Sequence, residues 1–197
     1  IESRPMAFGG KMAREVNVRS IVIQGLSVLL LCALIEIGAG NVMEGMKERL
    51  TVTLLGLIVM IPPLLDLRGN VNGALASRLG TALHTGVIEP KLSWSAELKV
   101  NVTSSLILSL LASTTIGILS CVMGSLLGIG PINVIALVTI AVVAGVVSGV
   151  ILAALTVITS IISYMKGWDP DNVTAPLMAT IGDLITMVSI FLVAVLV

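Results

Sequence analysis

Residues 132–164 read INVIALVTIAVVAGVVSGVILAALTVITSIISY, and no Asp, Glu, Lys or Arg interrupts this run. A helix needs roughly 20 apolar residues to cross the hydrocarbon core of a bilayer. Only helices and closed barrels satisfy every backbone polar group in lipid, and a run this long and continuous excludes a barrel strand. This stretch therefore predicts an all-α protein that is integral to a membrane.

The rest of the chain has the same character. It is 56% hydrophobic and 11% charged, with a mean hydropathy of +1.12, whereas a soluble domain carries about 25% charged residues. We predict a single transmembrane domain over residues 1–197. Within this domain, a short interfacial helix at residues 9–19 is expected to precede the first span. The five expected spans are residues 20–40, 50–85, 97–127, 132–164 and 172–197.

The second of these spans is too long for one crossing. A helix over residues 50–85 would measure about 54 Å, against a hydrocarbon core of about 30 Å. Pro62, Pro63 and Gly69 predict an interruption, although a helix projecting beyond the membrane is the alternative. Interrupted helices at membrane depth expose backbone carbonyls, which channels and transporters use to coordinate ions.

The basic residues predict the orientation in the membrane. Nine of the eleven Lys and Arg residues lie before the first span, in residues 68–99 and at Lys166. Cytoplasmic loops carry the excess of Lys and Arg, so we expect a multi-pass protein of the cell membrane with a cytoplasmic N-terminus and an extracytoplasmic C-terminus. A net charge of zero gives no reason to expect nucleic-acid binding.

Asp183 is the first candidate for a functional residue. Counted from Asn172, it lies about 16 Å into the last span, near the middle of the membrane. An ionisable group there costs at least about 2.5–3.5 kcal/mol and marks a functional site by default. Pairing with a neighbouring polar side chain for packing alone is the alternative. Thr180 lies one turn earlier on the same face and is expected to belong to the same site.

Asp66 and Asn70 are the next candidates, because they flank a glycine in the span that we expect to be interrupted. The alternative is a kink that leaves Asp66 and Arg68 at the inner surface of the membrane. Asn72 is a weaker candidate. Glu36 lies late in the first span, where an interfacial residue is the expected role and a ligand at the outer mouth is the alternative.

Asp169, Asp171 and Asn172 precede the last span. Side chains of this kind cap a helix N-terminus and favour its positive end, and acidic groups at the inner mouth of a pore also concentrate cations. Ser105, Ser109 and Ser113 repeat every four residues, which is typical of helix–helix packing in membranes.

The candidate ligands are carboxylates, amides and hydroxyls, which favour a hard cation. Mg²⁺ prefers oxygen ligands and keeps several of its waters, so one or two carboxylates can hold it. One deep aspartate per chain suits a site that a second copy completes, and two-fold dimers are the commonest oligomers. We therefore expect a homodimer with a pore at its two-fold interface.

Two motifs resemble a known family. Asp169-Pro-Asp-Asn-Val-Thr-Ala-Pro176 through Gly182-Asp183 is similar to the last membrane helix of the MgtE divalent-cation transporters, and is closest to their eukaryotic relatives, solute carrier family 41. Pro62-Pro-Leu-Leu-Asp-Leu-Arg-Gly-Asn70, followed by Leu75-Ala-Ser-Arg-Leu-Gly-Thr81, resembles the second helix of that family.

The resemblance implies a Mg²⁺ channel or transporter with a pore between two five-helix units, which are separate chains in MgtE and two halves of one chain in the eukaryotic relatives. A single unit here implies a homodimer. The resemblance assigns the central pore aspartate to Asp183, the pore-facing Gly-Asn to Asn70 and a carboxylate near the inner mouth to Asp169.

Three functions remain open at this stage. The first is a Mg²⁺ channel or transporter that is not an enzyme. The second is a carrier that uses Asp183 as an H⁺ or Na⁺ site. The third is an intramembrane aspartyl protease, which would need a second deep aspartate; Asp66 is expected to lie too near the inner face for that role.

Overall fold

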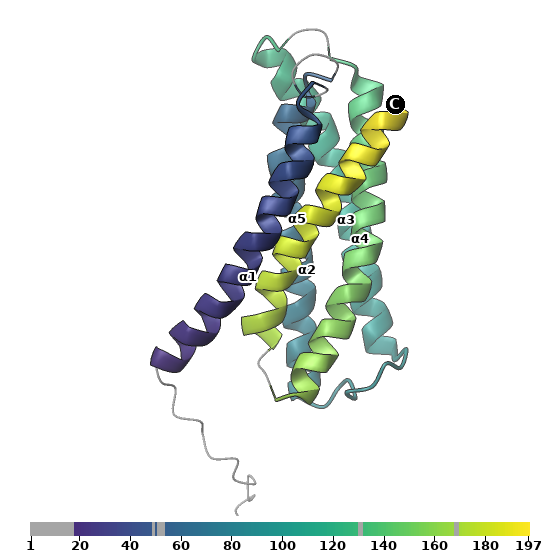
Figure 1. Ribbon diagram of the computed structural model, residues 1–197. Coiled ribbons are helices and arrows are strands. Elements are labelled where there is room, and N and C mark those ends of the chain that lie inside the picture. The colour runs from purple at the N-terminus through teal and green to yellow at the C-terminus, as the bar shows by residue number, and fades with distance from the viewer. Residues whose placement is uncertain (1–17, 49, 51–53, 130–131, 168–169) are drawn as a thin grey trace, which may run out of the picture.

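The computed structural model describes residues 18–48, 50, 54–129, 132–167 and 170–197, and these residues form five helices without a strand. The helices are α1 (Val18–Gly45), α2 (Leu57–His84), α3 (Ala96–Leu126), α4 (Val134–Met165) and α5 (Pro170–Leu196). The all-α class is therefore confirmed (Figure 1). Most of the expected interfacial helix at residues 9–19 lies outside the described residues; Val18 and Arg19 belong to α1.

Successive helices run in alternating directions through one bundle (Figure 1). α1 and α5 are parallel, because Cys32 lies next to Pro176 and, further along both helices, Gly38 lies next to Leu184. The first residue of α1 and the C-terminus consequently lie at opposite ends of the bundle.

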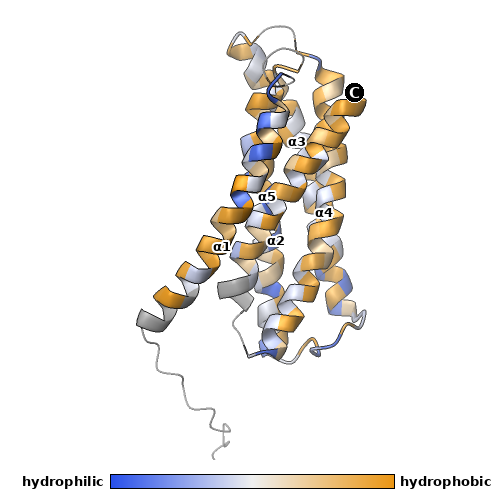
Figure 2. Cartoon of the chain, in the orientation of Figure 1, coloured by the Kyte–Doolittle hydropathy of each residue, from blue (hydrophilic) through white to orange (hydrophobic). Residues whose placement is uncertain are grey.

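Within the described part of the chain, four stretches are long and apolar enough to cross a membrane: Gly25–Gly45, Ala96–Leu126, Val134–Met165 and Thr174–Leu196. They belong to α1, α3, α4 and α5, and hydrophobic residues cover most of their length (Figure 2). α2 does not meet this criterion, since it carries Asp66, Arg68 and Arg78. A multi-pass membrane protein is thus confirmed.

α2 is one continuous helix of 28 residues, so the expected interruption at Pro62, Pro63 and Gly69 is wrong. Each proline removes a backbone donor from the helix. The helix persists because Leu57, Met60, Ile61 and Leu64 around the prolines are buried in the largest cluster of apolar side chains. Packing therefore overrides the local preference for a break.

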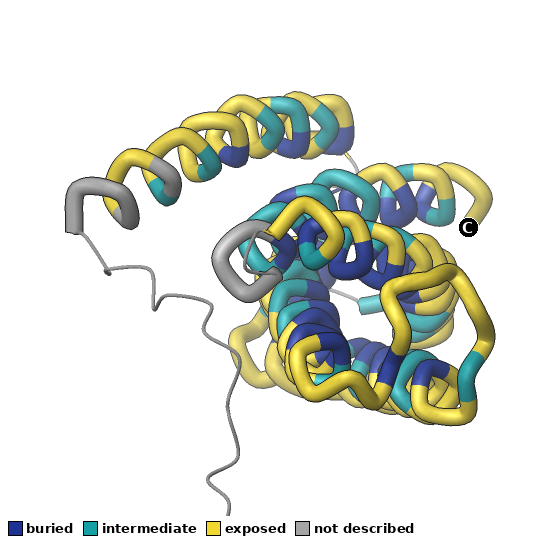
Figure 3. Tube along the Cα trace, turned by 90° about the horizontal axis from the view of Figure 1, so that it is seen from below, coloured by how far each residue is buried: buried dark blue, intermediate teal, exposed yellow. Residues whose placement is uncertain are grey.

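α2 occupies the interior of the bundle and α1 its periphery. α2 packs against α3, α4 and α5, whereas α1 packs mainly against α5. Figure 3 shows α1 at the edge of the bundle, with most of its residues exposed, and buried residues gathered between the other helices. The most polar of the described helices is therefore packed among three others.

Local sequence sets where the helices begin and end. Ser95 and Asn133 cap α3 and α4, because their side chains accept hydrogen bonds from the backbone N–H groups of Leu98 and Ala136. α3 ends at Leu126, and Gly128 follows it with a positive φ of 68°, which suits glycine and lets the N–H of Ile129 return to the carbonyl of Gly124.

Candidate cation site

Three carboxylates from three helices converge near the middle of the bundle. Asp183 lies halfway along α5, and its side chain forms a hydrogen bond with Glu36 of α1. Asp66 of α2 is close enough for its charge to act on Asp183. α5 brings the three together because it packs against both α1 and α2. We call Glu36, Asp66 and Asp183 the carboxylate cluster.

The carboxylate cluster is electrostatically unstable when it is fully charged. Like charges at short range repel strongly where the effective dielectric constant is low. A cation that enters the cluster would relieve this repulsion.

Asn70 belongs to the same face of α2 as Asp66. Its side-chain nitrogen donates a hydrogen bond of 2.8 Å to Asp66 Oδ2, one helical turn away. Both side chains are exposed on the surface of the single chain. The amide holds one oxygen of Asp66 in place and leaves the other free to face a cation.

Glu36 and Asp66 lie further along their helices than the sequence predicted. α1 continues to Gly45, so Glu36 lies about 14 Å before its end. α2 begins at Leu57 rather than Leu50, so Asp66 lies about 14 Å from its start. Both residues are close enough to Asp183 to act on it, and the depth of Asp66 in a membrane stays a prediction.

Thr180 and Asn72 lie close to the cluster in sequence but have different surroundings. Thr180, one turn before Asp183, is 7% exposed and packs within the chain. Asn72 is 1% exposed, and its side-chain nitrogen donates to the backbone carbonyl of Arg68 at 2.9 Å. Asn72 therefore turns into the bundle, away from the face shared by Asp66 and Asn70.

The acidic turn before α5 contributes little to the described site. Asp169 lies outside the described residues. Asp171 and Asn172 fall in the first turn of α5, where the helix is described but their side chains are not. The inner-mouth role expected for these three residues stays a prediction.

The site is open on one side. Glu36, Asp66 and Asn70 are exposed, and Asp183 is half-buried. Carboxylates that face lipid are costly. Among the described residues, no three Asp, Glu, His or Cys side chains are close enough to ligate one metal ion together.

Arg68 is the residue whose environment the sequence did not reveal. It is 0% exposed, and its Nη1 and Nη2 donate hydrogen bonds to Ser109 and Ser113 of α3 at 3.1 and 2.7 Å. Nε has no partner. The alternative that placed Asp66 and Arg68 together at the inner surface is therefore wrong.

One sequence signal could have located Arg68. Serines spaced by four residues present hydroxyls along one face of α3, and the two arginines of α2 reach that face. Arg78 donates to Ser105 Oγ at 2.9 Å and to Asn101 Oδ1 at 3.0 Å. The hydroxyls of Ser105, Ser109 and Ser113 thus accept hydrogen bonds from the two arginines of α2, in addition to the close helix packing that their spacing predicts.

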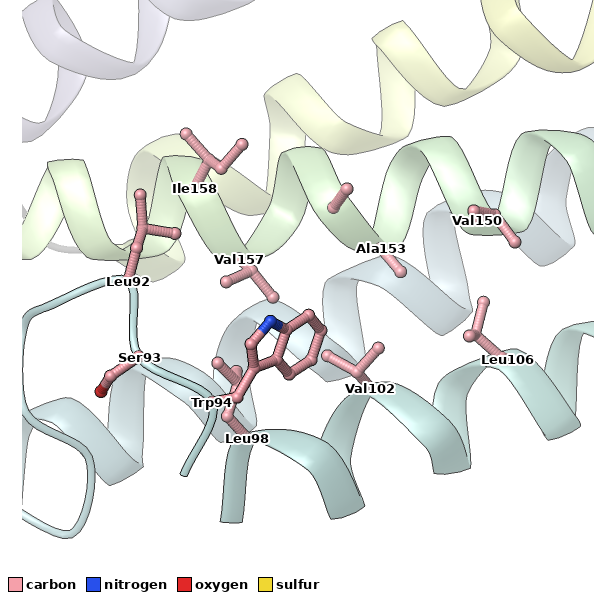
Figure 4. A pocket seen from close by; sticks show the side chains of 11 residues that line it. Leu92, Ser93, Trp94, Leu98, Val102, Leu106, Val150, Ala153, Val157 and Ile158 are labelled. Atoms are coloured by element: carbon pink, nitrogen blue, oxygen red, sulfur yellow. The ribbon is translucent and has the colours of Figure 1, made fainter. Parts of the chain in front are cut away.

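A groove of about 420 Å³ lies elsewhere, between α3, α4 and the loop that precedes α3 (Figure 4). Its lining is almost wholly apolar and includes Trp94, Leu98, Val102 and Val157. No member of the carboxylate cluster lines it. A cation would find no ligands there, so the groove does not compete with the carboxylate cluster as a cation site.

Comparisons with known proteins show which family the chain resembles. Residues 61–193 match the MgtE family, described as a divalent cation transporter. Solute carrier family 41 member 2 of Xenopus laevis is 29% identical over 191 residues, which are 91% of this chain and 32% of that protein. Solute carrier family 41 member 3 of Rattus norvegicus is 31% identical over 137 residues, or 66% of this chain and 29% of that protein.

The human member 2 of the same solute carrier family is 32% identical over 140 residues, which are 66% of this chain and 23% of that protein. The chain thus spans about a third or less of the length of these curated relatives. No solved structure shows significant similarity to it.

Proposed function

Since the chain belongs to the MgtE family of divalent cation transporters, we propose that it conducts or carries Mg²⁺ across a membrane, with the carboxylate cluster as its cation site. The family consists of transporters rather than enzymes. The observation that supports the site is the convergence of Glu36, Asp66 and Asp183 from α1, α2 and α5.

The chemistry of the cluster favours a hydrated Mg²⁺ ion. Oxygen is the only donor atom that the cluster and Asn70 present with a free lone pair, and Mg²⁺ prefers oxygen ligands. Mg²⁺ also loses its water reluctantly and is usually held by one or two carboxylates, the remaining positions being water. The absence of three direct ligands among the described residues agrees with this mode of binding.

A homodimer completes the site in our proposal. The exposed side chains of Glu36, Asp66 and Asn70 would face lipid in a single chain, which is unfavourable at this depth. A second copy related by a two-fold axis would cover this face and place two carboxylate clusters around one pathway. α2 then crosses the membrane as the fifth span, shielded by protein on all sides.

Replacing Asp183 by Asn tests the proposal. The substitution keeps the shape and removes the charge at the centre of the cluster, so Mg²⁺ uptake into proteoliposomes should fall by at least about thirtyfold, because a desolvated charged ligand contributes about 2–5 kcal/mol. Glu44→Gln is the matched control, since Glu44 lies on the exposed end of α1 and pairs with Lys47. Uptake by Asp183→Asn equal to that of the control would contradict the proposal.

The closeness of the Glu36 and Asp183 carboxyl groups favours a second candidate, a proton-coupled carrier. In such a carrier, a Mg²⁺ ion that enters the cluster would displace a proton held there. Titration of the purified protein with Mg²⁺ in weak buffer would then release about one proton per site. If no proton is released at any pH, the protein is a channel or a carrier that is not coupled to protons. If Asp183 is instead a Na⁺ site, Mg²⁺ uptake should depend on Na⁺.

We also propose that the N-terminus is cytoplasmic and the C-terminus extracytoplasmic. Five alternating helices place the two ends on opposite sides, and the basic residues favour the cytoplasm for the N-terminal side. A green fluorescent protein fused to the C-terminus should remain dark in bacteria, whereas alkaline phosphatase fused there should be active. The reverse pattern would contradict this orientation.

A further inference from the structure

Arg68 carries a positive charge that no described carboxylate neutralises. Burial is complete, and no Asp or Glu among the described residues lies within ion-pairing distance of the guanidinium. An unpaired buried charge is strongly destabilising. In a membrane-spanning bundle, such a residue is a functional candidate by default.

The surrounding helices are built to receive the guanidinium. Ser109 and Ser113 of α3 accept its hydrogen bonds. On α4, a Cβ atom at either Gly145 or Gly149 would lie 3.1 Å from an Nη atom of Arg68. Glycine at both positions therefore leaves room for the guanidinium between α3 and α4, where the hydroxyls solvate it.

Arg68 also lies directly behind the carboxylate cluster. A Cβ atom at Gly182, the residue before Asp183, would lie 3.3 Å from Arg68 Cβ. Asp66 is two residues away from Arg68 on α2, and residues two apart point to nearly opposite sides of a helix. The guanidinium and the Asp66 carboxylate are thus separated by about one helix diameter, roughly 10 Å.

We propose that Arg68 sets the strength of the cation site: its guanidinium is a fixed counter-charge that weakens the hold of the carboxylate cluster on a divalent cation enough for the ion to leave. The inference rests on the proposed function of that cluster. The bonds to Ser109 and Ser113 keep the charge in the bundle and fix the rotation of α2 that points Asp66 and Asn70 toward the site.

Electrostatics gives the expected direction. A positive charge about one helix diameter from the site repels a divalent cation, and protein between the two charges screens the repulsion less than water does. Removing the charge should tighten Mg²⁺ binding by about tenfold or more and slow its release. A residue with a purely structural role would have the opposite effect, because loosening the bundle would weaken binding.

The test compares Arg68→Met, which removes the charge, with Arg68→Lys, which keeps it. Isothermal titration with Mg²⁺ on protein in nanodiscs should give a Kd about tenfold lower for Arg68→Met, and values within about twofold of the unmodified protein for Arg68→Lys. Mg²⁺ uptake by Arg68→Met should saturate at lower Mg²⁺ with a reduced maximal rate. Arg78→Met is the matched control, because Arg78 bonds the same face of α3 but is exposed, and its Kd should not change.

Three results would overturn the inference. One is an unchanged Kd for Arg68→Met, and another is an equal loss of affinity in the Met and Lys variants. If Arg68→Met does not fold, Arg68→Gln replaces it, since Gln is neutral and can still bond the serines; failure of both neutral variants to fold would assign Arg68 a structural role only. If the unmodified protein binds no Mg²⁺, the proposed function itself fails, and this outcome is distinct from the other three.

Discussion

Arg68 and Asp183 are neighbours in the fold and face opposite sides of it. Asp183 turns toward the open face with Glu36, whereas the Arg68 guanidinium turns between α3 and α4. An isolated charge in an apolar run marks a residue from sequence alone, which is why Asp183 could be singled out. The direction of a side chain depends on tertiary packing, so the burial of Arg68 could not be predicted from the sequence.

Glu36 was the candidate that the sequence placed least well. Its depth depends on where α1 ends, and the polar residues after Gly40 predicted an end that lies too early. Its contact with Asp183 depends further on the parallel packing of α1 on α5, for which the sequence holds no signal. The identity of the Asp183 partner therefore required the three-dimensional structure.

Glu36→Gln should weaken Mg²⁺ binding about tenfold. The substitution keeps the length of the side chain and removes one of three charges, and losing a charged ligand next to Asp183 costs about 1.4 kcal/mol or more. Isothermal titration measures the effect, with Glu44→Gln on the same helix as the control. Equal Mg²⁺ affinities of Glu36→Gln and Glu44→Gln would show that Glu36 does not belong to the cation site.

At the scale of helices, α2 shows the limits of local rules. Two adjacent prolines and Gly69 favour a break, and a membrane transporter commonly uses one. The structure keeps the helix whole because its prolines lie among fully buried Leu57, Met60 and Leu64. In contrast, α3 and α4 could be predicted from their uninterrupted apolar runs, because a helix satisfies all the backbone polar groups of such a run in lipid.

The contact of α3 with α4 depends on small residues, and Gly149→Ala should disrupt it. The added methyl group would lie 3.1 Å from Arg68 Nη1 and 3.3 Å from Ser109 Cβ, which is tighter than normal packing. Overpacking of this kind costs about 1–3 kcal/mol. We expect a lower midpoint of thermal unfolding in detergent.

Gly40→Ala on α1 is the matched control for this prediction. Nothing lies within 4 Å of a Cβ atom at Gly40, and alanine favours a helix over glycine by roughly 0.5–1 kcal/mol. Its unfolding midpoint should therefore stay unchanged or rise. A fall of equal size in both variants would show that the tight approach at Gly149 is not the cause.

At the scale of the whole molecule, the five-helix bundle is polar on a side where a membrane protein should be apolar. Glu36, Asp66 and Asn70 are exposed there, although the outer surface of α1 and α3 is covered by large hydrophobic residues. The sequence predicted the membrane class and the family from composition and two motifs.

Cysteine cross-linking tests the proposed dimer. In a chain with Cys32 and Cys121 replaced by alanine, Asn70→Cys should form a disulfide between two copies and give a band at twice the chain mass of 20.4 kDa. Leu111→Cys, exposed on α3, should remain monomeric because it faces lipid. Cross-linking at Leu111 and not at Asn70 would place the interface elsewhere.

The alternation of α1 to α5 has a consequence for gene fusion. Because α1 starts at one end of the bundle and α5 finishes at the other, a second unit whose own α1 followed directly after Val197 would begin at the opposite end. Such a duplicate would be upside down, and its carboxylates would not meet those of the first unit by a two-fold axis along the membrane normal. Tandem duplication that preserves a paired site therefore needs one more crossing in the connecting segment.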